Sequence, residues 1–183
     1  AGYSGEVFAD RLDFDGESVF YDYCSENIEI KENIVEMNMS IEDIRLYAKN
    51  SSQIIALNNL TPNQLQRAAL NERTKTYGTH EELRALQEKM YDNYEIEYKV
   101  WDLISGTLFL AADVDWFIDK IKGKKVFMDI SNIYGYHTSH ACHDLSTLKK
   151  SFDRLIYLLE EHTEYYYLKG TDFTKKHVRR KSW

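Results

Sequence analysis

The stretch KKVFMDISNIYGYHTSHACHDLSTLKKSFDRLIYLLEEHTEYYYLKG, residues 124–170, decides the fold class. It begins with a compact apolar run at 124–131, which is typical of a buried β-strand. Residues 145–162 then repeat apolar side chains at 4-3-4 spacing, which predicts a helix with one apolar face. The aromatic run at 163–170 predicts a second strand. A strand, a helix and a strand in this order predict parallel pairing through a right-handed crossover.

The same alternation extends toward the N-terminus. Short strands are predicted at 17–22 and 95–105, and helices are predicted at 4–12, 25–37 and 113–123. We therefore expect a three-layer α/β fold, Rossmann-like, with a mostly parallel sheet and helices on both faces.

One helical segment stands apart from this alternation. Thr61 followed by Pro62 is typical of a helix start, and Thr79 with Glu82 forms a capping box. An inserted helical hairpin is therefore expected at about 61–92, within a single domain over 1–183.

Composition excludes several functional classes. The 183 residues carry a net charge of −7, which argues against binding to nucleic acid. No apolar run approaches the ~20 residues of a membrane span, and no signal peptide is visible. Two cysteines do not make a disulfide framework, so a reducing, cytoplasmic compartment is expected. The oligomeric state is not specified by the sequence.

Polar residues at the predicted strand ends are the candidate ligand-binding groups, because open α/β sheets bind ligands beyond the carboxyl ends of their strands. A glycine turn precedes the first predicted helix, and small polar or acidic residues follow each strand. The members of this set are Gly2, Ser4, Gly5, Asp22, Asp102, Ser105, Ser131, Asn132 and Asp172.

Four segments around these residues resemble the motifs of the class I S-adenosylmethionine-dependent methyltransferases. AGYSGEVFADRL (1–12) is similar to the tail of the family's glycine-rich first motif, and VFYDYC (19–24) is similar to its second motif. VWDLISG (100–106) and DISNIYGY (129–136) occupy the places of the third and fourth motifs.

The resemblance implies S-adenosylmethionine as the cofactor and assigns a role to each segment. The backbone around Gly2, Ser4 and Gly5 would approach the methionine end of the cofactor. Asp22 would accept hydrogen bonds from both ribose hydroxyls, since a carboxylate can accept two. Asp102 and Leu103 would flank the adenine.

The fourth motif would face the methyl acceptor, which the sequence does not identify. Its residues on that side would be Ser131, Asn132, Tyr134 and Tyr136. In the loop that follows, His137 could act as a general base or orient the acceptor.

The chain departs from the family in its first strand. The strand that precedes the glycine-rich motif in the family lies at the centre of the sheet, and it is absent before Ala1. Buried strand edges without partners cost roughly 1–3 kcal/mol per backbone group, so another segment, another subunit or an N-terminal extension should fill the gap. Within the chain, SSQIIALNN (51–59) is the best candidate. The sheet is also expected to stop after 163–170, without the family's closing hairpin.

Three other interpretations remain open. His137, His140, Cys142 and His143 are possible zinc ligands, but they lie within one short segment, so we expect no stoichiometric zinc. The strand VFMDISN also resembles the opening of PIN/NYN-type metal-dependent nucleases, in which Asp129, Asn132 and Asp172 would be the metal-binding groups. The third interpretation is a non-catalytic α/β module for binding or assembly.

Overall fold

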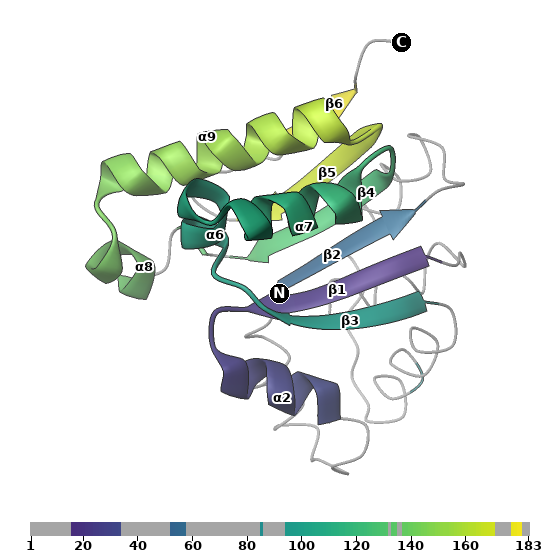
Figure 1. Ribbon diagram of the computed structural model, residues 1–183, viewed down its shortest axis with the longest axis horizontal. Coiled ribbons are helices and arrows are strands. Elements are labelled where there is room, and N and C mark those ends of the chain that lie inside the picture. Colours follow the sequence, from purple (N-terminus) through teal and green to yellow (C-terminus); the bar gives the residue numbers. More distant parts are fainter. Residues whose placement is uncertain are drawn as a thin grey trace.

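The computed structural model describes residues 16–33, 52–57, 85, 94–131, 133–134, 137–170 and 177–180. Figure 1 shows the elements. The strands are β1 (Gly16–Asp22), β2 (Ser52–Leu57), β3 (Tyr94–Val100), β4 (Lys125–Ser131), β5 (Tyr165–Gly170) and β6 (His177–Arg180). The described residues include the helices α2 (Ser25–Asn33), α6 (Leu103–Phe109), α7 (Ala111–Ile121), α8 (His137–Cys142) and α9 (Leu145–His162).

The strands form one mixed sheet in the order β3-β1-β2-β4-β5-β6. β1 is parallel to β3 and β4 is parallel to β5, whereas β2 is antiparallel to both of its neighbours and β6 is antiparallel to β5. The α/β class is confirmed. The expectation of a mostly parallel sheet is wrong for the described strands, because three of their five pairings are antiparallel.

The place between β1 and β4 is filled from within the chain by β2, from the segment 51–59 that was the best internal candidate among the alternatives left open by the sequence. β2 pairs with β1 on one side and with β4 on the other, and Ile54 is the register partner of both Val19 and Met128. β2 begins at the edge where β1 ends, since Tyr21 is paired with Ser52. A chain that re-enters the sheet at this edge forms an antiparallel pair, because a parallel partner would require a crossover to the other edge.

The sheet does not stop at β5. Residues 177–180 add an antiparallel edge strand, with Val178 paired to Tyr167. The sequence HVRR has one apolar residue and three basic or polar ones, so it lacks the alternation that signals a strand. Backbone pairing with β5 forms the strand instead, and the expectation that the sheet stops after 163–170 is wrong.

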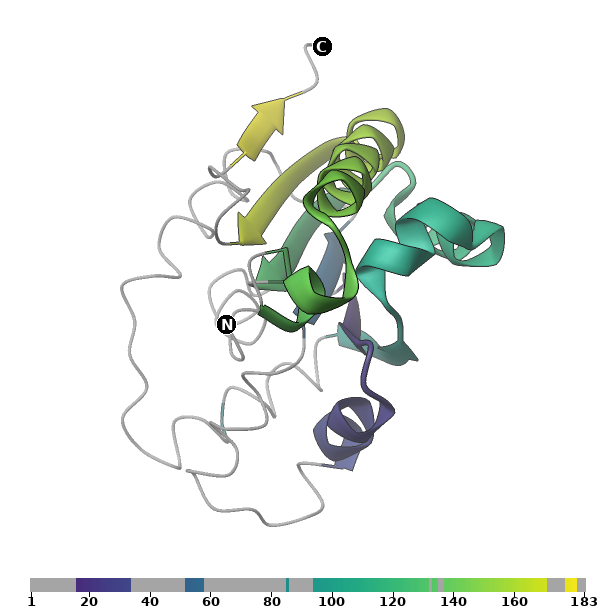
Figure 2. The ribbon, with the colours of Figure 1, turned by 90° about the vertical axis from the view of Figure 1, so that its left-hand side faces the viewer.

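Helices α6, α7 and α9 lie together on one face of the sheet (Figure 2). The apolar face of α9 was predicted from its spacing, and it is buried against α6, α7 and β5. Val19, Ile54, Val126 and Met128 of the strands contribute to the same core.

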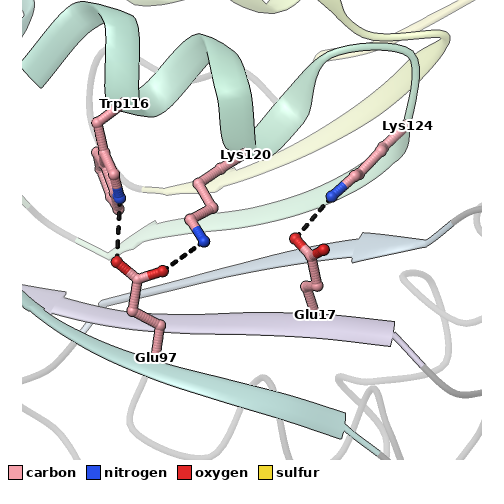
Figure 3. A network of polar contacts seen from close by, with 5 residues as sticks. All are labelled: Glu17, Glu97, Trp116, Lys120 and Lys124. Carbon is pink, nitrogen blue, oxygen red and sulfur yellow. Dashed lines mark hydrogen bonds and ion pairs between the residues drawn. The ribbon is translucent and has the colours of Figure 1, made fainter.

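α7 and the turn that follows it are held over the β1–β3 end of the sheet by polar contacts with two glutamates (Figure 3). Glu97 of β3 accepts a hydrogen bond from Trp116 Nε1 at 3.0 Å and forms an ion pair with Lys120. Glu17 of β1 pairs with Lys124 at 2.6 Å. Partly exposed ion pairs of this kind contribute at most about 1 kcal/mol each, so the contacts orient α7 more than they stabilise it.

Two predicted elements have different limits in the structure. The strand predicted at 95–105 ends at Val100, because Asp102 caps a helix that begins at Leu103. The predicted helices at 4–12 and 61–92 lie outside the described residues, apart from residue 85.

Candidate functional site

The candidate site lies at the edge of the sheet where β1, β3, β4 and β5 all have their carboxyl ends. On one side of β2 lie β1 and β3, and on the other lie β4 and β5. Asp22 ends β1, and it is the register partner of Val100 in β3. The Trp101 N–H donates to the Asp22 carbonyl at 2.8 Å. Asp22 and Asp102, far apart in sequence, therefore lie at neighbouring strand ends.

Asp22 carries its carboxylate in a half-buried position. Its Oδ1 accepts a hydrogen bond from the Cys24 N–H at 2.8 Å. Burial raises the pKa of Asp22 above its ordinary value, although hydrogen bonds from Cys24 and Asn27 act in the opposite direction. The fold thus holds the Asp22 carboxylate in a partly buried, hydrogen-bonded position at the end of β1.

Asp102 has a local structural role that the sequence analysis did not assign. Its Oδ1 accepts from the Ile104 N–H at 3.0 Å, and its Oδ2 accepts from Ser105 Oγ at 2.7 Å. These are the contacts of a helix N-cap, and they fix the carboxylate at the start of α6.

The capping role leads to a direct prediction. We expect Asp102→Ala to lower the free energy of unfolding by about 1 kcal/mol, because the first turn of α6 loses its side-chain acceptor. Asp102→Asn should lose less, since asparagine also caps helices well. Urea denaturation measures both variants, with the exposed Asp115→Ala on α7 as the control. Equal stability of Asp102→Ala and wild type would show that the Asp102 side chain does not stabilise α6.

Two residues expected at the crevice lie in the core instead. The Leu103 side chain is buried in the main apolar cluster, so only its backbone is placed to approach an adenine. Tyr134 was expected to face the acceptor, but it is completely buried. Its hydroxyl lies 2.9 Å from Ser151 Oγ of α9, and its ring meets Phe152 edge-on. The Tyr134 side chain, in the turn after β4, therefore packs against α9.

Burial raises the pKa of Tyr134 well above its ordinary value. The hydrogen bond with Ser151 opposes this shift, and the negative charge of Asp102 adds to it. The phenol therefore stays protonated at neutral pH, and it is unsuited to act as a general base.

The remaining predicted site residues are placed only in part. Ser131 ends β4 just after an irregularity in its pairing with β5, and His137 begins the short helix α8. The side chains of both residues lie outside the described part. Gly2, Ser4, Gly5, Asn132, Tyr136 and Asp172 lie outside it entirely.

The metal-dependent interpretations gain no support from the described residues. Among them, no group of three or more His, Cys, Asp or Glu side chains is arranged to hold a metal ion. Cys142 is exposed and His143 is half-buried, whereas the His140 side chain lies outside the description. Asp129, the first acid of the nuclease interpretation, is buried within β4.

The sequence analysis missed Trp101, Thr107 and Ser151. Trp101 is buried and its ring contacts Tyr21 and Phe117, while its backbone N–H donates to the Asp22 carbonyl. Thr107 and Ser151 share a buried hydrogen bond between α6 and α9. A signal for Ser151 was available, because it interrupts the apolar face of the clearest predicted helix.

The fold is a mixed α/β sheet with helices, and two acids, Asp22 and Asp102, lie at neighbouring strand ends of its carboxyl edge. No family model, curated protein or solved structure matches the chain. In the part of the chain that the structure describes, no helix has both the length and the hydropathy needed to cross a bilayer.

Proposed function

We propose that this chain binds S-adenosylmethionine at the carboxyl edge of β1, β3 and β4 and transfers its methyl group to an acceptor. The observation that carries the proposal is the placement of Asp22 and Asp102 at the ends of two adjacent parallel strands. A ribose diol requires two acceptors at close range, and a carboxylate supplies both. In the proposed complex, the neighbouring strand end at Asp102 and Leu103 would flank the attached base.

The strand order also supports the proposal. Four strands run in one direction with the order β3-β1 on one side of β2 and β4-β5 on the other. In the proposed arrangement these four strands would correspond to those of a doubly wound sheet, with the antiparallel β2 in the central place. A three-layer, Rossmann-like arrangement with helices on both faces forms part of the proposal.

The residues of the chain would mainly position the reactants. The cofactor supplies a methyl group on a sulfonium, which moves to a lone pair of the acceptor while the sulfur keeps the bonding electrons. Ser131 and Asn132 follow β4 and would hold the acceptor. His137, at the start of α8, would take a proton from an acceptor that has to lose one.

Isothermal titration with S-adenosylmethionine and S-adenosylhomocysteine tests the proposal directly. We expect one site with a dissociation constant in the micromolar range, about −8 kcal/mol. Titration at millimolar ligand without heat or thermal shift would contradict cofactor binding.

Asp22→Asn provides a sharper test, because it separates a ligand-binding carboxylate from a structural one. The variant keeps an acceptor for the Cys24 N–H but loses the charge. We expect cofactor affinity to fall by about 1.5–3 kcal/mol, or roughly 10- to 150-fold.

The same variant should become more stable at neutral pH. Because the pKa of Asp22 is raised in the folded state, its ionised form destabilises the fold above that pKa, and this effect disappears as the pH falls through it. Asparagine removes the unfavourable charge at every pH, so the melting temperature should rise. Glu26→Gln, on an exposed acid of α2, should change neither affinity nor stability. Unchanged affinity of Asp22→Asn for S-adenosylmethionine would show that the Asp22 carboxylate does not bind the ribose.

A further inference from the structure

Three buried hydroxyl groups connect three separate segments behind the candidate site. Tyr134 Oη lies 2.9 Å from Ser151 Oγ, and Ser151 Oγ lies 2.9 Å from Thr107 Oγ1. Thr107 Oγ1 donates to the Leu103 carbonyl at 2.8 Å, with the Ile104 carbonyl at 3.2 Å. The chain of hydroxyls thus links the turn after β4, the helix α9 and the first turn of α6.

The hydrogen bonds of this chain have one consistent direction. The Thr107 hydroxyl donates to carbonyls of its own helix, so its oxygen accepts from Ser151. Ser151 Oγ then accepts from Tyr134, whose phenol keeps its proton because burial raises its pKa. Each hydroxyl gives its one proton to the next group, and Ser151 joins the other two.

Ser151 occupies a position where an apolar residue would be expected. It is completely buried on the face of α9 that also carries Leu148 and Leu155. A buried hydroxyl contributes little apolar stabilisation, and it is tolerated only when it is hydrogen-bonded. Its two hydrogen bonds impose a fixed geometry that an apolar side chain would not.

We propose that Ser151 is a positioning residue that holds the two sides of the candidate site in register. On one side it acts through Thr107 on α6, the helix capped by Asp102. On the other side it acts through Tyr134, three residues after Ser131. The inference rests on the proposed function, in which Asp102 belongs to the cofactor side and Ser131 to the acceptor side. Ser151 itself is buried and touches neither ligand.

Hydrogen exchange on the protein without ligand tests the positioning role. Two amides report on the two sides: the Gly106 N–H donates to the Asp102 carbonyl at 2.7 Å, and the Ile133 N–H donates to the Ile130 carbonyl at 3.0 Å. In Ser151→Ala we expect exchange at both amides to rise at least tenfold, while the ladder between β1 and β2 stays within twofold of wild type.

Thr163→Val is the matched control. Thr163 is also buried, and its hydroxyl donates to the Leu159 carbonyl at 2.6 Å, at the other end of α9. Loss of the Thr163 hydroxyl should leave the exchange rates of the Gly106 and Ile133 amides unchanged. A uniform rise over the whole sheet in Ser151→Ala, or the same pattern in Thr163→Val, would reduce Ser151 to ordinary structural support and overturn the proposal. If Ser151→Ala does not fold, Tyr134→Phe is used instead, because it removes the hydroxyl that bonds to Ser151 and keeps the ring. An unchanged exchange rate at the Ile133 amide in Tyr134→Phe would also overturn the proposal.

A titration in two backgrounds connects the positioning role to the site. We expect Ser151→Ala to weaken S-adenosylmethionine binding at least fivefold in the wild-type background and by less than twofold in Asp102→Ala, because that change removes both the cap of α6 and the carboxylate through which Ser151 would act. Equal losses in both backgrounds, or wild-type affinity in Ser151→Ala, contradict the proposal. If the wild-type protein binds no S-adenosylmethionine, the proposed function fails, and the exchange pattern still decides whether Ser151 holds the two sides together.

Discussion

Ile54→Ala should lower the free energy of unfolding by about 2–5 kcal/mol, the range for truncating a buried isoleucine. Ile54 is 1% exposed in the central strand β2, and it belongs to the main apolar cluster. β2 pairs with β1 and β4 at once, so its loss would leave two strands with unpaired backbone groups inside the sheet. The cost is a large fraction of the ~5–15 kcal/mol stability of a typical domain.

Urea denaturation measures this loss, and hydrogen exchange at residues 54–57 shows whether β2 opens only with the whole sheet. Val100→Ala is the matched control, because Val100 is an apolar strand residue that is 51% exposed. It should change stability by less than about 1 kcal/mol. A small loss in Ile54→Ala, together with rapid exchange at 54–57, would contradict the central placement of β2.

Gly106→Ala is expected to destabilise the protein, although the same change inside a helix ordinarily stabilises it by up to about 1 kcal/mol. A Cβ at position 106 would lie 2.2 Å from Trp101 Nε1 and 2.9 Å from Trp101 Cδ1. The indole cannot move aside, because it is buried against Tyr21, Trp116 and Phe117. Forcing extra volume into a packed core costs about 1–3 kcal/mol, and occasionally more.

Thermal unfolding and the near-ultraviolet circular dichroism of the tryptophans measure the effect of Gly106→Ala. Trp101→Phe in the same chain is the internal control, because the smaller ring vacates the space that the new methyl group requires. The double variant should therefore be more stable than the sum of the two single losses predicts. Strict additivity would show that the methyl group is accommodated without contact with Trp101.

Trp101 also links this packing to the candidate site. Its backbone N–H donates to the Asp22 carbonyl, and Asp102 follows it directly. A displaced indole would shift both strand ends, so Gly106→Ala should weaken the proposed binding of S-adenosylmethionine as well as lower stability.

Much of the fold could be predicted from local sequence patterns. The apolar spacing of 145–162 predicted α9, and the compact runs at 17–22 and 124–131 predicted β1 and β4. The segment 51–59 was identified as the filler of the central place by its β-branched residues, and β2 lies there. Such patterns show which faces of a segment are buried, because burial follows the order of apolar and polar residues along the segment.

The candidate site could be predicted only in outline. Asp22 and Asp102 were recognised as strand-end acids, and the sheet brings their strand ends together. Tyr134 and Leu103 were expected at the crevice, but both are buried in the core, because the direction of a side chain after a strand depends on the helix packed above it. The capping role of Asp102 was missed, since the strand was expected to continue to 105.

The sequence by itself determined which segments become strands and helices and which faces they bury. Only the tertiary structure decided the direction of β2, the pairing of HVRR with β5 and the burial of Tyr134 against Ser151. The physical reason is that the alternation of apolar and polar side chains specifies neither the direction of a strand in the sheet nor the strand with which it pairs. Direction and pairing follow from where the chain re-enters the sheet, and from backbone hydrogen bonds that every residue except proline can make.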